Sequence, residues 1–396
     1  MTGPAHDHDS TGEAGMDGAD LTWDAGAQKA GFSLPARFFY DRDIFERECT
    51  DIFYKSWQLV AHINELDGPG AFVTLDIIDQ SVIVVRGADG VIRAFHNVCR
   101  HRGNRLTEER RGVSSAFVCG YHAWTYGTDG ALRGAPKTDA IPGFDRSCFG
   151  LVPVRVEVFA SFIFVNLDDG AKPITEMAPG AEVLIRSHMP DLDTLELIEE
   201  VDVPVAANWK VIQENSIEGY HFEYSGPEHK QLAKLIDFSG YRLTPHGEWW
   251  TYIGPPKPGT TEAYGVPLEG ATWQTDGFFN FGLWPNATLY VFPYADMVGT
   301  FIMTPTGPET STLRFGYYGP KGRAQSEVTK ACVRWMNEDL GPEDIRLNVT
   351  TQKGLRSLGY QHGVYLIGDG VTNRSELLVR HFHHLCHRAI NGSSGA

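Results

Sequence analysis

Two cysteines and two histidines, arranged as two mixed pairs, constrain this chain more than any other feature. Cys99 and His101 are separated by one residue, and Cys119 and His122 by two. Seventeen residues lie between His101 and Cys119. A thiolate and an imidazole this close in sequence can reach one centre from the tip of a single loop. Two such loops therefore predict four ligands for one inorganic centre.

The distribution of ligand types between the loops distinguishes the possible metals. Zinc sites with two Cys and two His usually keep like ligands together, as C-x2-4-C and H-x3-5-H. Here each loop carries one Cys and one His. That arrangement suits a [2Fe–2S] cluster with two Cys on one iron and two His on the other. The spacing favours this cluster over structural zinc and over unrelated core Cys and His residues.

The same stretch resembles the Rieske [2Fe–2S] motif. The resemblance includes Arg102-Gly103 after the first pair and Ala123-Trp124 after the second. It is to the oxygenase branch, because the cytochrome bc branch holds an additional disulfide-forming Cys pair in these loops. No other Cys lies between Cys99 and Cys119.

A second motif extends the resemblance from about Phe38 to His387. The chain is similar to the α subunits of Rieske non-haem iron oxygenases, also called aromatic ring-hydroxylating dioxygenases, through Asn208-Trp209-Lys210, Glu214-Asn215, Glu218 and Tyr220-His221. The resemblance implies that His221 binds a mononuclear Fe(II) together with a second His and one carboxylate. Such a site leaves iron positions open for O2.

The second His is where the sequence departs from the family pattern. The family usually places it five residues after the first, where this chain has Gly226. The next His is His229, and a loop longer by three residues would bring it back to the metal. We therefore expect His229 to be the second ligand, with His246 as the alternative.

The resemblance also implies the carboxylate ligand and one further role. The family has an acidic pair some eight residues before a Gln that is followed by Gly-Leu, which Glu343-Asp344 and the stretch 352–355 match. Asp344 is the expected ligand, and Glu343 is the alternative. In the family, the acid at the position of Glu218 bridges the first His to a Rieske His of a neighbouring subunit.

The strand and helix patterns predict an α+β protein with an N-terminal all-β Rieske domain and a C-terminal catalytic domain, in which helices surround an antiparallel sheet. We expect a disordered tail (1–32), a lead-in helix packing on the catalytic domain (33–57), the Rieske domain (58–168) and the catalytic domain (169–396). Helix is expected within 174–200, over 208–222, and over 325–340, 342–358 and 374–386. Aromatic-rich segments between 249 and 318 predict the strands of the second sheet.

Composition limits the partners and the compartment. The net charge of −16 argues against nucleic acid and anionic membranes as partners. Six scattered Cys, without a signal peptide or a long apolar run, predict a cytoplasmic protein with reduced thiols. By resemblance, a homotrimer would take electrons from a separate NAD(P)H reductase or ferredoxin and use O2 to hydroxylate or dealkylate a small aromatic or amine substrate.

Overall fold

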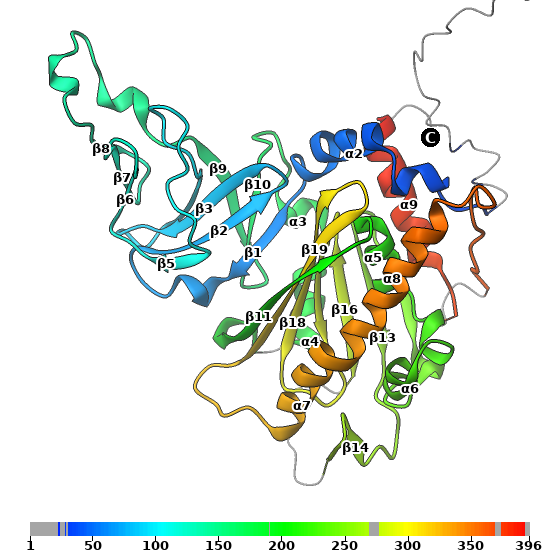
Figure 1. Cartoon of the computed structure of the whole chain (residues 1–396). Coiled ribbons are helices and arrows are strands. Elements are labelled where there is room, and N and C mark those ends of the chain that lie inside the picture. The colour runs from blue at the N-terminus through cyan, green and yellow to red at the C-terminus, as the bar shows by residue number, and fades with distance from the viewer. Residues whose placement is uncertain are drawn as a thin grey trace, which may run out of the picture.

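The computed structural model describes residues 23, 28, 31–189, 191–268, 277–368 and 374–392. Two antiparallel sheets of seven strands each organise the molecule (Figure 1). The expectation of an α+β fold with an N-terminal all-β part is confirmed. Among the described helices, none is both long and apolar enough to cross a membrane.

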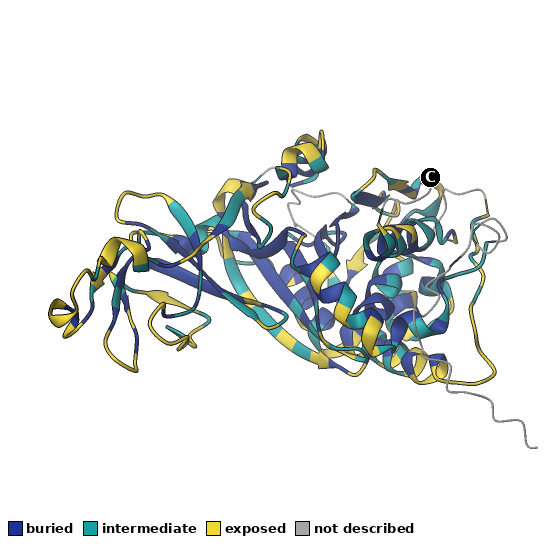
Figure 2. Ribbon diagram, turned by 90° about the horizontal axis from the view of Figure 1, so that it is seen from above, coloured by how far each residue is buried: buried dark blue, intermediate teal, exposed yellow. Residues whose placement is uncertain are grey.

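The first sheet has the order β1-β10-β9-β4-β3-β2-β5. Its strands are β1 (Gln58–His62), β2 (Ala71–Ile77), β3 (Gln80–Arg86), β4 (Ile92–His96), β5 (Arg111–Val113), β9 (Pro153–Phe159) and β10 (Phe162–Asn166). A small sheet, β6 (Ala116–Val118), β7 (Thr125–Gly127) and β8 (Leu132–Gly134), carries the loop with Cys119. Figure 2 shows exposed residues gathered on the loops at this end of the molecule, while the strands behind them are buried.

The second sheet has the order β11-β19-β18-β17-β16-β13-β12. Its strands are β11 (Leu195–Val205), β12 (Arg242–Pro245), β13 (Trp249–Gly254), β16 (Phe278–Leu283), β17 (Ala287–Val291), β18 (Val298–Gly307) and β19 (Thr310–Pro320). A separate hairpin pairs β14 (Glu262–Ala263) with β15 (Val266–Pro267).

Both faces of the second sheet are covered. Because side chains alternate along a strand, Phe279 and Phe281 face a core that includes Ile185 of α4, while Phe278 and Asn280 face the opposite side. Helix α8 crosses that opposite side in Figure 1. The helices are α2 (Arg42–Glu48), α3 (Ile174–Met177), α4 (Ala181–His188), α5 (Trp209–Ser216), α6 (Pro227–Ala233), α7 (Glu327–Trp335), α8 (Gly341–Leu355) and α9 (Leu377–Asn391).

The lead-in segment is not one continuous helix. A 3-10 turn (Ala36–Phe39) precedes α2, and a π turn (Cys49–Phe53) follows it. The interruption lies at Asp41, whose carboxylate caps α2 by accepting the backbone N–H groups of Asp43 and Ile44. The segment contacts α5 through the Phe53 ring, 5.0 Å from that of Trp209.

One other expectation needs correction. Residues 174–200 contain the short helices α3 and α4, but β11 begins already at Leu195, where it pairs with β19.

The tail expected to be largely disordered (1–32) lies mostly outside the described residues, so that expectation stays a prediction. Trp23, one of the described residues, is 2% exposed and packs on His384 and His387 of α9.

Ion pairs to two largely buried carboxylates join the two sheets. Arg110, just before β5, and Arg111, its first residue, both pair with Glu200 of β11, at 3.1 and 3.0 Å. Arg111 also pairs with Glu65 at 3.1 Å, and Glu65 accepts a hydrogen bond from the Tyr318 hydroxyl of β19 at 3.0 Å. The Glu65 and Glu200 side chains are only 7% and 12% exposed, so losing a partner would cost more than at the surface, and the contacts help to fix how the sheets meet.

Candidate active site

The loops that carry Cys99 and Cys119 have the same backbone hydrogen bonds. In each loop the Cys N–H donates to the carbonyl five residues later, Asn104 or Trp124, at 2.8 Å. The Cys carbonyl in turn accepts the N–H of the fourth residue after it at 3.0 Å. That fourth residue, Gly103 or Ala123, has positive φ. The two loops therefore share one backbone frame, on which His101 is the second residue after its Cys and His122 is the third.

The four side chains divide into an inner and an outer pair. Cys99 and Cys119 are each 2% exposed, whereas His101 and His122 are exposed, with ring centroids 4.6 Å apart. Burial would raise the pKa of the Cys119 thiol, but the N–H groups of Tyr121 and His122 and the Cys99 thiol lower it overall. Buried thiolates and outer imidazoles suit a [2Fe–2S] cluster whose Cys-bound iron lies inside.

A tyrosine adds a hydrogen bond to the inner pair. The hydroxyl of Tyr126 lies 3.4 Å from Sγ of Cys99 and accepts the backbone N–H of Arg100 at 2.9 Å. Because the hydroxyl oxygen already accepts from Arg100, its own proton is available to the sulfur. Hydrogen bonds to the sulfurs are one determinant of the potential of such clusters.

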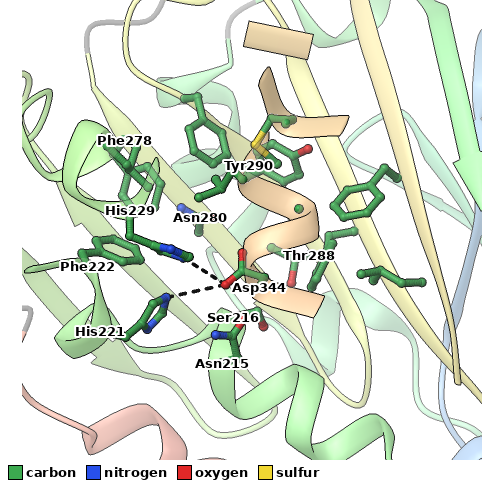
Figure 3. A pocket seen from close by; sticks show the side chains of 18 of the residues that line it. Asn215, Ser216, His221, Phe222, His229, Phe278, Asn280, Thr288, Tyr290 and Asp344 are labelled. Atoms are coloured by element: carbon green, nitrogen blue, oxygen red, sulfur yellow. Dashed lines mark hydrogen bonds and ion pairs between the residues drawn. The ribbon is translucent and has the colours of Figure 1, made fainter. Parts of the chain in front are cut away.

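The compact set of potential ligands consists of His221, His229 and Asp344 (Figure 3). His221 lies in a 3-10 turn (Tyr220–Glu223), while His229 and Asp344 lie in the first turns of α6 and α8. Oδ1 of Asp344 is 2.9 Å from Nε2 of His229 and 3.9 Å from Nε2 of His221. The structure thus brings together the three residues expected from the sequence, in a two-His-one-carboxylate arrangement that suits Fe(II).

Two glutamates hold the opposite nitrogens of these imidazoles. Nδ1 of His221 bonds to Glu218, and Nδ1 of His229 lies 2.5 Å from Oε1 of Glu343. A proton kept on Nδ1 leaves the Nε2 lone pair free for a metal. Burial alone would lower the pKa of His229, but the hydrogen bonds and charges of Asp344 and Glu343 raise it.

The predicted helix over 208–222 ends early, and this places His221. Helix α5 stops at Ser216, and the Glu218 carboxylate accepts the backbone N–H groups of Tyr220 and His221. In a continuous helix those N–H groups would bond to carbonyls four residues earlier. One carboxylate therefore redirects the chain and orients the His221 ring.

Gly226 allows the chain to return to the metal set. It precedes Pro227 at the start of α6, and a Cβ atom on it would lie 1.7 Å from Oε2 of Glu343. A side chain at this position would displace the carboxylate that holds His229. In this chain, Gly226 occupies the position where the family usually has its second His, and it contacts Glu343, the carboxylate that holds Nδ1 of His229.

The alternatives raised by the sequence lie elsewhere. His246 stacks on Trp249, with ring centroids 3.8 Å apart, and is not in the compact set. Glu343 faces Nδ1 of His229, whereas Asp344 faces both Nε2 atoms. Position therefore favours His229 over His246, and Asp344 over Glu343.

A cavity of about 690 Å³, including its mouth, opens beside His221, His229 and Asp344 (Figure 3). Aromatic rings form much of its wall, namely Phe222, Tyr252, Phe278, Phe292, Phe301 and Phe315. Its described lining contains no Lys or Arg. The cavity is suited to a small molecule with substantial apolar surface.

Comparison with protein families decides the identity. Residues 192–392 match the catalytic domain of the ring hydroxylating alpha subunit, and residues 56–145 match the Rieske [2Fe-2S] domain. The chain belongs to the Rieske oxygenase α subunits. It is therefore the terminal oxygenase of a Rieske system, with a [2Fe–2S] cluster and a mononuclear iron, and it works with a separate reductase.

Several Rieske oxygenases match over most of their length. The carnitine monooxygenase oxygenase subunit of Escherichia coli (strain K12) is 34% identical over 355 residues, which are 89% of this chain and 92% of that protein. The chloroplastic choline monooxygenase of Atriplex hortensis is 28% identical, covering 90% of this chain and 77% of that protein. A crystal structure of a quaternary ammonium Rieske monooxygenase with its substrate L-carnitine superposes with a TM-score of 0.80 at 30% identity, covering 90% and 95% of the chains.

Sequence reasoning missed several residues of this Rieske oxygenase site. The contact of Tyr126 with Cys99 joins residues 27 apart, and the contact of Gly226 with Glu343 joins two distant segments. No local motif marks either one. The cavity residues Asn280 and Thr288 looked like ordinary strand residues, and only the sheet register places them beside the metal set.

Proposed function

We propose that this oxygenase oxidises a small amine, of the quaternary ammonium class, at a C–H bond next to nitrogen. One oxygen atom of O2 enters the C–H bond, and the other leaves as water with two electrons and two protons. An N–CH2OH group formed in this way releases formaldehyde and the demethylated amine. Aromatic hydrocarbon breakdown, the other substrate class expected from the sequence, is less favoured, because the relatives at 34% and 28% identity are named for carnitine and choline.

The observation that carries the proposal is the position of the metal set at the wall of an aromatic cavity without a lining cation. Aromatic faces attract a quaternary ammonium group through cation–π interactions. The carboxylates of Asp344, Glu218 and Glu343 add negative charge on the metal side. A cationic substrate is therefore favoured over an anionic one.

Nε2 of His221, Nε2 of His229 and a carboxylate oxygen of Asp344 are the proposed ligands of the iron. When bound, the iron supplies the positions at which O2 is reduced. Glu218 and Glu343 keep the two imidazoles in the Nδ1–H tautomer, and the aromatic wall excludes water from the reacting carbon. Cys99, His101, Cys119 and His122 are the proposed cluster ligands.

A homotrimer is proposed because the two centres lie in different parts of one chain. In Figure 1 the β6–β8 end is remote from α6 and α8. Exposed apolar side chains lie near each centre, Tyr121 and Ile141 at the cluster end, and Tyr224 beside the turn that carries His221. Head-to-tail contacts of this kind close into a ring and would bring the cluster of one subunit to the iron of the next.

Glu218 is proposed to connect the centres across that interface. Its carboxylate already holds His221, and a second imidazole from a neighbouring subunit could donate to it as well. Glu218→Gln replaces one acceptor oxygen by a donor, so iron should bind 10–100-fold more weakly and still reach full occupancy in excess, while coupled turnover of the fully loaded protein falls by at least tenfold. Glu223→Gln on the same turn is the control. Normal turnover in Glu218→Gln would refute the bridge.

The substrate class is tested by turnover with a surrogate reductase, NADH and a panel of amines. We expect formaldehyde and the demethylated amine from at least one quaternary ammonium compound. Oxidation of aromatic hydrocarbons alone would refute the amine class. The free cysteines of the described chain agree with a cytoplasmic location, which remains part of the proposal.

A further inference from the structure

Three buried polar groups in the cavity wall have no hydrogen-bond partner within the described chain. They are Nδ2 of Asn280, Oγ1 of Thr288 and the hydroxyl oxygen of Tyr290. These residues are 4%, 2% and 3% exposed, and all three line the cavity (Figure 3). Buried polar groups are nearly always hydrogen-bonded in native proteins. Several such groups in one cavity point to a ligand that supplies a missing partner.

The sheet register places Asn280 and Thr288 side by side on one face of the sheet. Asn280 of β16 lies opposite Tyr290 of β17, and Thr288 is two residues before Tyr290 on the same face. Asn280 and Thr288 are therefore diagonal neighbours, about 7–8 Å apart at their backbones. Side chains reaching from these positions can converge on one atom between them. Nδ2 of Asn280 can only donate a hydrogen bond, whereas the Thr288 hydroxyl can donate or accept one, so a partner shared by both must be an acceptor such as oxygen.

The charges around the cavity decide what kind of oxygen fits. No described lining residue is Lys or Arg. Asp344 lines the cavity, and Glu218 and Glu343 stand directly behind the two His residues. A carboxylate held by Asn280 and Thr288 would lose its water without meeting a cationic side chain there, which is costly. A hydroxyl or carbonyl oxygen has no such cost.

We propose that Asn280 and Thr288 bind an uncharged oxygen of the substrate, which is an ammonium alcohol or a carbonyl analogue and not a betaine carboxylate. The inference rests on the proposed function, because the nitrogen end must then lie near His221, His229 and Asp344. The oxygen end lies against β16 and β17. Two rigid strands thereby set the distance between the recognised oxygen and the oxidised carbon.

Binding to the iron-loaded trimer, without reductase and without oxygen, tests the inference apart from turnover. Three probes are compared by calorimetry: choline, n-propyltrimethylammonium, in which a methyl group replaces the hydroxyl, and glycine betaine, which carries a carboxylate. We expect choline to bind roughly tenfold more tightly than either of the others. Only choline offers both donors an oxygen without also requiring a carboxylate to lose its water.

The variants Thr288→Val and Asn280→Leu each remove a donor and keep the number of side-chain heavy atoms. Either one should weaken choline binding roughly tenfold and leave n-propyltrimethylammonium binding unchanged. Thr251→Val is the matched control, because Thr251 is equally buried on neighbouring β13 but does not line the cavity. The cluster spectrum and the iron content show that each variant is folded.

The outcomes separate the inference from the function on which it rests. Equal binding of choline and n-propyltrimethylammonium to the unmodified protein overturns the oxygen site and leaves the amine class standing. Tighter binding of glycine betaine than of choline overturns the uncharged oxygen in the same way. Thr288→Val and Asn280→Leu variants that both keep full choline affinity would show that only water occupies the two donors. Failure of all three probes to bind overturns both the amine class and the inference.

Discussion

Gly226 and Glu343 are in contact: a Cβ atom on residue 226 would lie 1.7 Å from Oε2 of the glutamate. The same carboxylate holds His229 through Nδ1, at 2.5 Å, and through its backbone N–H, at 3.2 Å. Residue 226 is not itself a proposed ligand, but the space it leaves for Glu343 controls the orientation of His229, which is one.

Gly226→Ala should weaken iron binding at the mononuclear site. The added methyl group pushes Glu343 away from His229, and losing a carboxylate behind a metal-binding His typically costs 10–100-fold in metal affinity. Iron titration of the metal-depleted site measures this, with the cluster absorbance as internal reference. Gly354→Ala in α8 is the control, because a Cβ there meets nothing within 4 Å. Equal affinity in the two variants would contradict the contact.

His229→Ala should remove the mononuclear iron and spare the cluster. His229 is 1% exposed, and its Nε2 faces Asp344, so the loss leaves a pair of ligands. Iron per chain should fall from about three to about two with an unchanged cluster spectrum. His246→Ala is the control and should keep about three. The reverse result would assign the ligand to His246.

Replacing Asp344 and replacing its neighbour Glu343 should affect iron binding differently. Asp344→Ala removes the oxygen that faces both Nε2 atoms, so the mononuclear iron should be lost. Glu343→Gln keeps the shape next to His229 but removes the negative charge, so iron should bind 10–100-fold more weakly and still reach full occupancy in excess. Full iron content in Asp344→Ala, together with its loss in Glu343→Gln, would reverse the assignment.

Tyr126→Phe should lower the potential of the cluster. The hydroxyl lies 3.4 Å from Sγ of Cys99, and a hydrogen bond to sulfur stabilises the reduced, more negative cluster. A net contribution of about 0.5–1.5 kcal/mol corresponds to about 20–65 mV for one electron. A potentiometric titration followed by EPR measures it. Tyr121→Phe, on the exposed side of the second loop, should shift the potential less, and equal shifts would refute the specific bond.

The sequence predicted the parts of the site that depend on local spacing. These parts are short patterns: the two Cys–His pairs, the second motif around His221 and the acidic pair at 343–344. The structure brings His221 and Asp344 together. The composition of 208–222 predicts a continuous helix, with Glu214, Glu218 and His221 on one stripe. The side chain of Glu218, which bonds the backbone that the helix would have used, decides otherwise.

Contacts between distant segments could not be predicted in the same way. The choice between Glu343 and Asp344 depends on which side of α8 faces α6, and a one-residue difference on a helix turns a side chain by about 100°. Asn280 and Thr288 depend on the register of two strands, which hydrophobic alternation alone does not give. Trp23 lies in a Gly-rich stretch, and its burial depends on two His residues of α9 at the other end of the chain.

The pairing of Arg110 and Arg111 with Glu200 ties the arm that carries the cluster loops to the second sheet. A swinging motion of this arm would take two guanidinium partners away from the Glu200 carboxylate, whose side chain is only 12% exposed. In the proposed homotrimer, the distance between the cluster of one subunit and the iron of the next is therefore set when the subunits assemble. Turnover with saturating reductase should then be insensitive to added viscogen, and it should fall on dilution below the concentration at which the proposed trimer dissociates.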